Sequence, residues 1–184
     1  MDRTRDFLAP LPARVYRRPH HDVTRLASRL EDGGALEQAL AVLFAVGGIP
    51  SVYAGDEQAF HGIKTEGVGG DDAVRPAFPE SPQGLWPDGW PVYRRHQELI
   101  GLRRRHPWLI RARAKPLRLE NTRLLVELAH HGKRLYLALN LDEPASFTAP
   151  DAKTVLAGRD AHLTGDRSLH LGAKGWAILS TAQC

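Results

Sequence analysis

The chain of 184 residues is 42% hydrophobic and 25% charged, with a formal net charge of +4, a composition that excludes collagen-like and mainly disordered proteins. Its single cysteine, Cys184, excludes an internal disulfide framework and a cysteine-based zinc site. The longest strongly apolar stretch, from Ala39 to Val46, is far shorter than the roughly 20 residues that a membrane-spanning helix needs, so no membrane partner is expected.

The first half of the chain contains two helical patterns and one short β-rich run. Residues 1–19 have three prolines and five arginines without a period, and they are predicted to be irregular. Apolar residues spaced by three and four positions predict a helix over residues 35–46, ended by two glycines. Ile49–Ala54 is predicted to be a buried strand, and a second helix is predicted for Val92–Arg105.

A long polar segment separates that strand from the second helix. Residues 58–91 are rich in glycine, proline and aspartate and show no amphipathic period. Loops of such length inside a compact domain are usually functional. His106-Pro107 then ends the second helix.

Beyond Lys115-Pro116 the apolar residues repeat every second position. Residues 124–128 and 135–141 alternate on either side of His131-Gly132-Lys133, which predicts a hairpin. Shorter strands are predicted at Thr154–Leu156, Leu169–Leu171 and Trp176–Leu179. The chain therefore divides near residue 114 into a helix–strand–helix part and an all-β part.

Charged clusters offer weaker signals. Residues 91–118 carry nine cations against the single acid Glu98, but they contain no nucleic-acid-binding motif, so a solvated helix face is favoured over nucleic-acid binding. His20-His21-Asp22 cannot converge on one metal from extended backbone, because neighbouring side chains point to opposite faces. The pairs Asp71-Asp72 and His130-His131 are interpreted as a polar loop and an exposed turn, so no metal site is predicted.

Four motifs occur in a fixed order along the chain. They are His21-Asp22-Val23-Thr24-Arg25, the run G-I-P-S-V-Y-A-G-D-E at 48–57, V-R-P-A-F-P at 74–79, and the helix that leads into His106-Pro107-Trp108-Leu109. In this order they resemble the α-amylase superfamily of glycoside hydrolases, at the end of its seventh barrel strand, its eighth strand, the following loop and its last barrel helix. The β-rich tail is similar to the C-terminal sandwich domain of that family, so that the resemblance covers roughly residues 21–180.

The resemblance implies an α/β plus all-β fold. Residues 20–114 would form an incomplete (β/α)8 TIM-barrel end, comprising the last strand and helices, and residues 115–184 a small antiparallel β-sandwich domain. Residues 1–19 need not belong to the original fold, because Arg17-Arg18-Pro19 stands where the family has a buried strand.

The resemblance also implies roles for single residues. Asp22 would be the carboxylate that stabilises the transition state, His21 would bind a sugar hydroxyl, and Arg25 is a candidate substrate-binding residue. Retaining glycosidases pass through an oxocarbenium-like transition state, which hydrogen bonds that strengthen as charge develops can stabilise. Tyr53, Asp56 and Glu57 are expected to shape the strand-end loop. No cofactor is expected.

The two other carboxylates of the family lie upstream of its third one. Its nucleophile follows the fourth strand and its acid–base glutamate the fifth, and no segment of this sequence resembles either motif. The chain is therefore predicted to be a fragment of an enzyme that hydrolyses or transfers α-glucosidic bonds, and to be inactive in isolation, so whether it is itself an enzyme stays open.

Two other function classes remain as alternatives. A non-catalytic carbohydrate-binding or assembly module could complement a separately encoded barrel half, and an arginine-rich nucleic-acid binder is less favoured. The expected partners are an α-glucan or oligosaccharide in the intact enzyme and such a barrel half. The N-terminus has no apolar signal region, which favours the cytoplasm.

Overall fold

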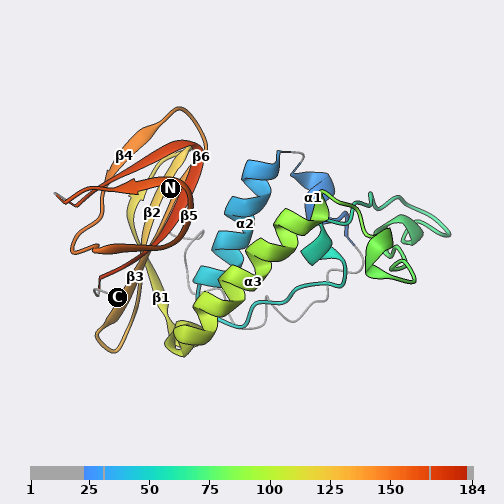
Figure 1. The fold of residues 1–184 in the computed structure, drawn as a ribbon, viewed down its shortest axis with the longest axis horizontal. Coiled ribbons are helices and arrows are strands. Elements are labelled where there is room, and N and C mark those ends of the chain that lie inside the picture. Colours follow the sequence, from blue (N-terminus) through green and yellow to red (C-terminus); the bar gives the residue numbers. More distant parts are fainter. Residues whose placement is uncertain (1–22, 31, 166, 182–184) are drawn as a thin grey trace.

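A computed structural model describes residues 23–30, 32–165 and 167–181 (Figure 1). Two helices lie between an antiparallel sheet on one side and a loop-rich segment on the other (Figure 1). The elements are α1 (Leu26–Arg29), α2 (Gly33–Ala45), the 3₁₀ turns η3 (Asp56–Gln58), η4 (Asp72–Val74) and η5 (Pro82–Gly84), α3 (Gly89–Arg105), η6 (Pro107–Arg111), β1 (Arg113–Leu119), β2 (Arg123–His130), β3 (Lys133–Asn140), β4 (Ala145–Thr148), β5 (Thr154–Leu163) and β6 (Ser168–Ser180).

Both predicted helices are present. Asp32 caps α2, because its side chain accepts a hydrogen bond from the backbone N–H of Gly34 at 2.8 Å. Helix α3 begins three residues earlier than predicted, since Pro91 fits the first turn of a helix, where its missing N–H has no intrahelical role. It ends at Arg105, before His106-Pro107, as predicted.

The guanidinium of Arg103 ties α3 to the end of α2. It donates to the carbonyls of Phe44 at 2.6 Å and Val46 at 2.9 Å, and also to that of Gly48. These carbonyls lie at and just beyond the last turn of α2, where backbone acceptors lack intrahelical partners. At least one cation of the basic end of α3 therefore has a structural role, because it holds α3 against the end of α2.

The predicted β2–β3 hairpin is confirmed. His130 pairs with Lys133, and the two turn residues between them, His131 and Gly132, have φ angles of 46° and 78°. Two positive φ angles are typical of the two-residue turn that matches the twist of a hairpin.

The sheet is single and differs from the predicted sandwich. Its strands follow the order β1-β2-β3-β6-β4, and β5 also pairs with β6. The 13-residue β6 joins them, because its last part pairs with β3, its first part with β4, and both parts with β5. The segments predicted as separate strands at Leu169–Leu171 and Trp176–Leu179 are thus two ends of one strand. The expectation of two packed sheets is wrong, since continuous pairing along β6 keeps all strands in one curled sheet.

The sequence patterns missed β1 and β4. Strand β1 contains Pro116 and is largely exposed, because it forms the edge of the sheet and pairs only with β2 among the described strands. Strand β4 has four residues, too few for a period-2 pattern.

Both faces of the sheet are buried. One face packs against α2 and α3 through residues such as Phe44, Leu99 and Leu137, and the opposite face buries Tyr136 and Phe147 inside the curl. This explains why all six residues from Leu135 to Asn140 are buried, although the strand alternates between faces. The helices and the sheet therefore share one hydrophobic core.

The predicted strand at Ile49–Ala54 is absent. These residues have no regular secondary structure, and 67% of the surface of Ile49 is exposed. An isolated strand is not stable without a hydrogen-bonded neighbour, and no other strand of the described residues lies beside this one. No helix among the described residues is long and apolar enough to cross a membrane.

Candidate functional site: the Arg25 cluster

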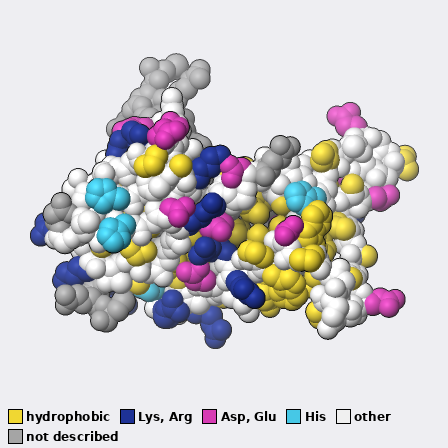
Figure 2. Space-filling view, turned by 45° about the horizontal axis from the view of Figure 1, so that its top comes forward, with side chains coloured by type: hydrophobic (Ala, Val, Ile, Leu, Met, Phe, Trp, Pro, Cys, Tyr) yellow, Lys and Arg dark blue, Asp and Glu magenta, His cyan; other side chains and the backbone are white. Residues whose placement is uncertain are grey.

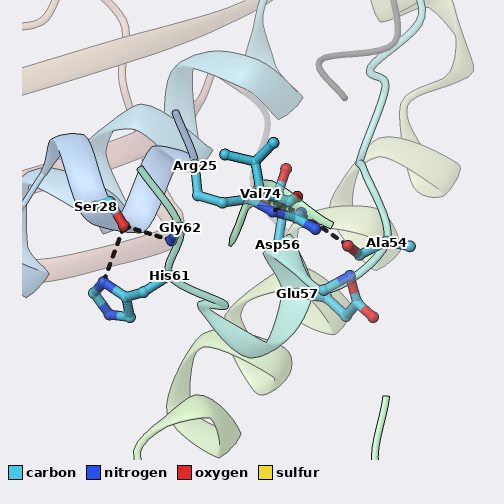
Figure 3. Close-up of polar contacts among 9 residues, drawn as sticks. Arg25, Ser28, Ala54, Asp56, Glu57, His61, Gly62 and Val74 are labelled. Carbon is cyan, nitrogen blue, oxygen red and sulfur yellow. Dashed lines mark hydrogen bonds and ion pairs between the residues drawn. The ribbon is translucent and has the colours of Figure 1, made fainter. Parts of the chain in front are cut away.

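Arg25 connects three segments that are distant in the sequence (Figure 3). Its Nε donates to the carbonyl of Val74 at 2.8 Å, and its Nη1 donates to the carbonyl of Ala54 at 2.8 Å. The same Nη1 forms an ion pair with Asp56 Oδ1 at 3.0 Å. We call Arg25, Tyr53, Ala54, Asp56 and Val74 the Arg25 cluster.

The guanidinium of Arg25 is almost completely shielded from solvent. Only 3% of the residue is exposed, whereas 23% of the Asp56 side chain is. Its flat face lies over the ring of Tyr53, 4.2 Å from the centroid, in the geometry of a cation–π contact. A planar group with five donors can serve several acceptors at once, which a lysine ammonium cannot do with the same geometry.

A second set of hydrogen bonds holds α1 against the loop that follows η3. The Arg25 backbone N–H donates to the carbonyl of Gly62 at 2.9 Å, and the Gly62 N–H donates to Ser28 Oγ at 2.8 Å. Ser28 Oγ also lies 3.3 Å from His61 Nδ1 (Figure 3). The Lys64 N–H donates to Thr24 Oγ1 at 3.1 Å, so that residues 24–28 and 61–64 run side by side.

The turn at Gly55-Asp56-Glu57 has a rigid shape. Gly55 has a φ of 92°, and a side-chain carbon at this position would lie 2.4 Å from Phe60 Cδ2, so only glycine fits. Glu57 Oε2 accepts the Gly55 N–H at 2.9 Å, and the Phe60 N–H donates to the Gly55 carbonyl at 2.9 Å. Glu57 and Asp56 thus each hold part of this loop.

The predicted site residues fall into two groups. His21 and Asp22 lie outside the described residues, whereas Arg25, Tyr53 and Asp56 are brought together in one cluster. The candidate substrate-binding residue Arg25 is buried, and its Nε and Nη1 donate to protein acceptors. No group of three metal-ligating side chains is present in the part of the chain that the structure describes.

Sequence patterns missed several members of this network. The carbonyls of Val74 and Ala54 carry no side-chain signal, so only the fold shows that Arg25 reaches them. Ser28 and His61 are 33 residues apart and belong to no motif that was singled out.

Apolar side chains are exposed around this part of the molecule. Figure 2 shows hydrophobic side chains gathered over one side of the surface. Those near the cluster in sequence include Val23, Ile49 and Val52, with 37%, 67% and 38% of their surface exposed. Further along, 63% of Ile63 and 62% of Trp86 are exposed. A contiguous exposed apolar patch, such as the one in Figure 2, is typical of a contact surface.

No protein-family model matches the sequence, and no curated protein matches it either. Solved structures do match. A debranching enzyme from Nostoc punctiforme is 23% identical, with a TM-score of 0.68 over 87% of this chain and 32% of that chain. A cyclic α-maltosyl-(1→6)-maltose hydrolase from Arthrobacter globiformis is 24% identical, with a TM-score of 0.65 over 88% of this chain and 34% of that chain.

An α-amylase from H. orenii is 16% identical, with a TM-score of 0.67 over 87% of this chain and 38% of its own. The chain thus spans about a third of the length of the solved structures that it matches. The neighbours are α-amylase-family enzymes, and the β-rich part of this chain matches their C-terminal domain. The likeness to the α-amylase superfamily that the sequence motifs indicate is therefore confirmed at the level of the fold.

Proposed function

We propose that this chain supplies the last part of an α-amylase-type catalytic barrel, with its C-terminal β domain, to an enzyme that hydrolyses or transfers α-glucosidic bonds. One observation carries the proposal: the segment that begins three residues after Asp22 lies beside Ala54 and Asp56, connected through Arg25. The motifs of these two segments resemble the ends of two neighbouring barrel strands. In β/α barrels the catalytic side chains lie at such carboxyl ends.

Asp22 is the catalytic residue of this proposal. Its carboxylate would accept hydrogen bonds from sugar hydroxyls and stabilise the positive charge that develops as the glycosidic bond breaks. His21 would bind a neighbouring hydroxyl. Interactions that are stronger in the transition state than in the ground state raise the rate of the chemical step.

Arg25 is a positioning residue rather than a substrate-binding one. Its side chain is 3% exposed and already donates to Val74, Ala54 and Asp56, which leaves no room for a sugar between them. Because it anchors the backbone three residues after Asp22, it would fix where that carboxylate is presented. Tyr53, Asp56 and Glu57 would support this anchor and the turn beside it.

The exposed apolar residues fit a chain that is completed by another polypeptide segment. Ile49 and Val52 belong to the strand-like motif, which has no strand beside it among the described residues, and their exposure is what the absence of adjacent barrel strands would leave. Without the nucleophile and the acid–base carboxylate, Asp22 has no bond cleavage to assist. The isolated chain is therefore expected to be inactive on α-glucans.

A carbohydrate-binding or assembly module is the second candidate. The shared core of helices and sheet favours it, since the described residues form a packed body without a complete barrel. The two candidate functions differ in the role of Asp22, because a module that only binds or assembles would not need this carboxylate.

The proposal is tested by measuring the turnover of maltooligosaccharides by the isolated chain, with the Asp22→Ala variant as the matched control. We expect no activity above that control. Turnover that depends on Asp22 would show that the chain carries a complete site, and would contradict the proposal. Binding of maltooligosaccharide that survives in Asp22→Ala would favour the module instead.

A further inference from the structure

A pocket lies at the closed end of the β2–β3 hairpin, where β1 begins. Its volume of about 790 Å³ falls within the range of small-molecule sites. Five cations line it: Arg111, Arg113, Lys115, Lys133 and Arg134. They belong to η6, β1 and β3, and His130, the last residue of β2, and His131, in the turn, also line the pocket.

The register of the sheet places Arg113, Lys115 and Arg134 on one face. Arg113 pairs with Ala129, which pairs with Arg134, and the next row on the same face holds Lys115 opposite Glu127. Since side chains alternate between faces, this is the face that buries Tyr136 inside the curl of the sheet. The face therefore changes from apolar to cationic toward the hairpin turn.

Most of this positive charge is uncompensated. Glu127 is the one acid among the described lining residues, so that this lining carries a formal charge of +4 with both histidines neutral. Arg134 pairs with Glu127 at 3.4 Å and with Asp151, outside the lining, at 3.6 Å. Arg111, Arg113 and Lys133 make no ion pair with any described residue. By contrast, other cations of the basic block are held by the protein: Arg95 pairs with Glu37 at 3.1 Å, and Arg118 pairs with Glu120 at 2.7 Å.

We propose that this pocket binds a small molecule through a diphosphate group. Guanidinium groups match phosphate oxygens with paired donors, and a group with about three negative charges offsets most of the local charge. The site lies at the end of the sheet and does not involve Asp22 or the Arg25 cluster, so the proposal is independent of the function proposed above.

Nucleic acid fits this pocket less well than a small anion does. Single-stranded nucleic acid is usually bound by aromatic stacking along a basic groove, and no Phe, Tyr or Trp is among the described residues that line the pocket. Three other arginines of the basic block, Arg95, Arg103 and Arg118, are engaged by protein groups. A compact ligand is therefore favoured.

His130 provides an additional property of the pocket. Partial desolvation holds its pKa below the ordinary value, and the neighbouring His131, Arg111, Arg113 and Lys133 lower it further. The charged and titratable groups that line the pocket with His130 are Arg111 of η6, Arg113 and Lys115 of β1, Glu127 of β2, His131 of the turn, and Lys133 and Arg134 of β3. An anion among them favours the protonated imidazole, so binding should take up a proton and become tighter as the pH falls below neutrality.

Isothermal titration of the full chain with inorganic pyrophosphate, at fixed ionic strength, tests the proposal. We expect one site per chain and binding at least about tenfold tighter than that of sulfate. The variant Arg111→Gln/Arg113→Gln should weaken pyrophosphate binding by about tenfold or more. The matched control is Arg29→Gln/Arg94→Gln, which removes two exposed arginines of α1 and α3 and should bind as the parent does.

Further ligands identify the chemistry that is recognised. ADP that binds as tightly as pyrophosphate indicates a nucleotide-type or other diphosphate ester, whereas preference for pyrophosphate indicates the inorganic ion, and either result supports the diphosphate site. If the two double variants lost equal affinity for pyrophosphate, binding would depend on net charge alone, and the proposal would be overturned. A monophosphate ester that binds as tightly as pyrophosphate would overturn it as well. An oligonucleotide or a phosphatidylserine vesicle that binds more tightly, with the same dependence on Arg111 and Arg113, would replace the small molecule by that partner.

Discussion

Replacement of Arg25 by alanine removes the centre of the Arg25 cluster. The change leaves the carbonyls of Val74 and Ala54 without their donor and the carboxylate of Asp56 without its counter-ion. Removal of one partner from a buried ion pair typically costs about 3–5 kcal/mol. Because 23% of the Asp56 side chain is exposed, water can replace part of the interaction, and we expect the free energy of unfolding to fall by about 3 kcal/mol.

Chemical denaturation measures this loss, and hydrogen exchange shows where it acts. The amide of Gly62, which donates to Ser28, should exchange faster in Arg25→Ala, because α1 is released from the loop. Arg25→Lys should recover part of the stability, since a lysine keeps the charge but cannot serve three acceptors. Arg29→Ala, an exposed change on the same helix, should alter stability by about 0.5 kcal/mol or less. If Arg25→Ala and Arg29→Ala were equally stable, the cluster would not hold these segments together.

Three further changes test the core, a buried amide and the hairpin pocket. Phe44 of α2 is 2% exposed and packs in the core shared with the sheet, so Phe44→Ala should lower the free energy of unfolding by about 3–5 kcal/mol. Helices and sheet should still unfold in one transition, and separate transitions in the far-UV and tryptophan signals would disprove the shared core. Asn140→Ala should cost about 2–3 kcal/mol in urea denaturation, because its Nδ2 donates to the carbonyls of Asp142, Glu143 and Gly172, while the exposed Asn121→Ala should be neutral. The folded state holds the pKa of His130 below its unfolded value, so the unfolded state binds more protons and the free energy of unfolding falls with decreasing pH. His130→Gln should reduce this dependence of stability on pH near pH 6. An unchanged dependence would show that His130 does not cause it.

Local patterns predicted the elements that carry their own signal. The stripe of leucines in α2, the proline after α3 and the alternation in β2 and β3 each reflect a period or a breaker that acts within a few residues. The way in which β6 joins its neighbours could not be predicted, because pairing between strands depends on contacts between distant residues. The edge strand β1 was missed since exposed, basic residues with a proline resemble a loop.

In the candidate site, too, local motifs could be recognised from the sequence, whereas contacts between distant residues could not. The motif around Arg25 and the Gly55-Asp56-Glu57 turn were recognised as neighbours in a barrel, and the structure brings them together. The role of Arg25 could not be read from its residue type, because an arginine next to a catalytic motif can face a substrate or the interior. Only the burial of its side chain and the carbonyls of Ala54 and Val74 distinguish the two. Ile49–Ala54 has the composition of a strand, but no strand among the described residues lies beside it.

A chimaeric enzyme tests the central claim most directly. The segment of the Nostoc punctiforme debranching enzyme that matches this chain, about a third of its length, would be replaced by this chain from His21 onward. We expect a folded chimaera that hydrolyses α-glucans, and a drop in kcat of about a hundred- to a thousandfold in its Asp22→Asn variant, with KM little changed. A folded chimaera whose activity is absent, or is the same with Asp22 and with Asn at that position, would contradict the assignment of this chain to the catalytic barrel.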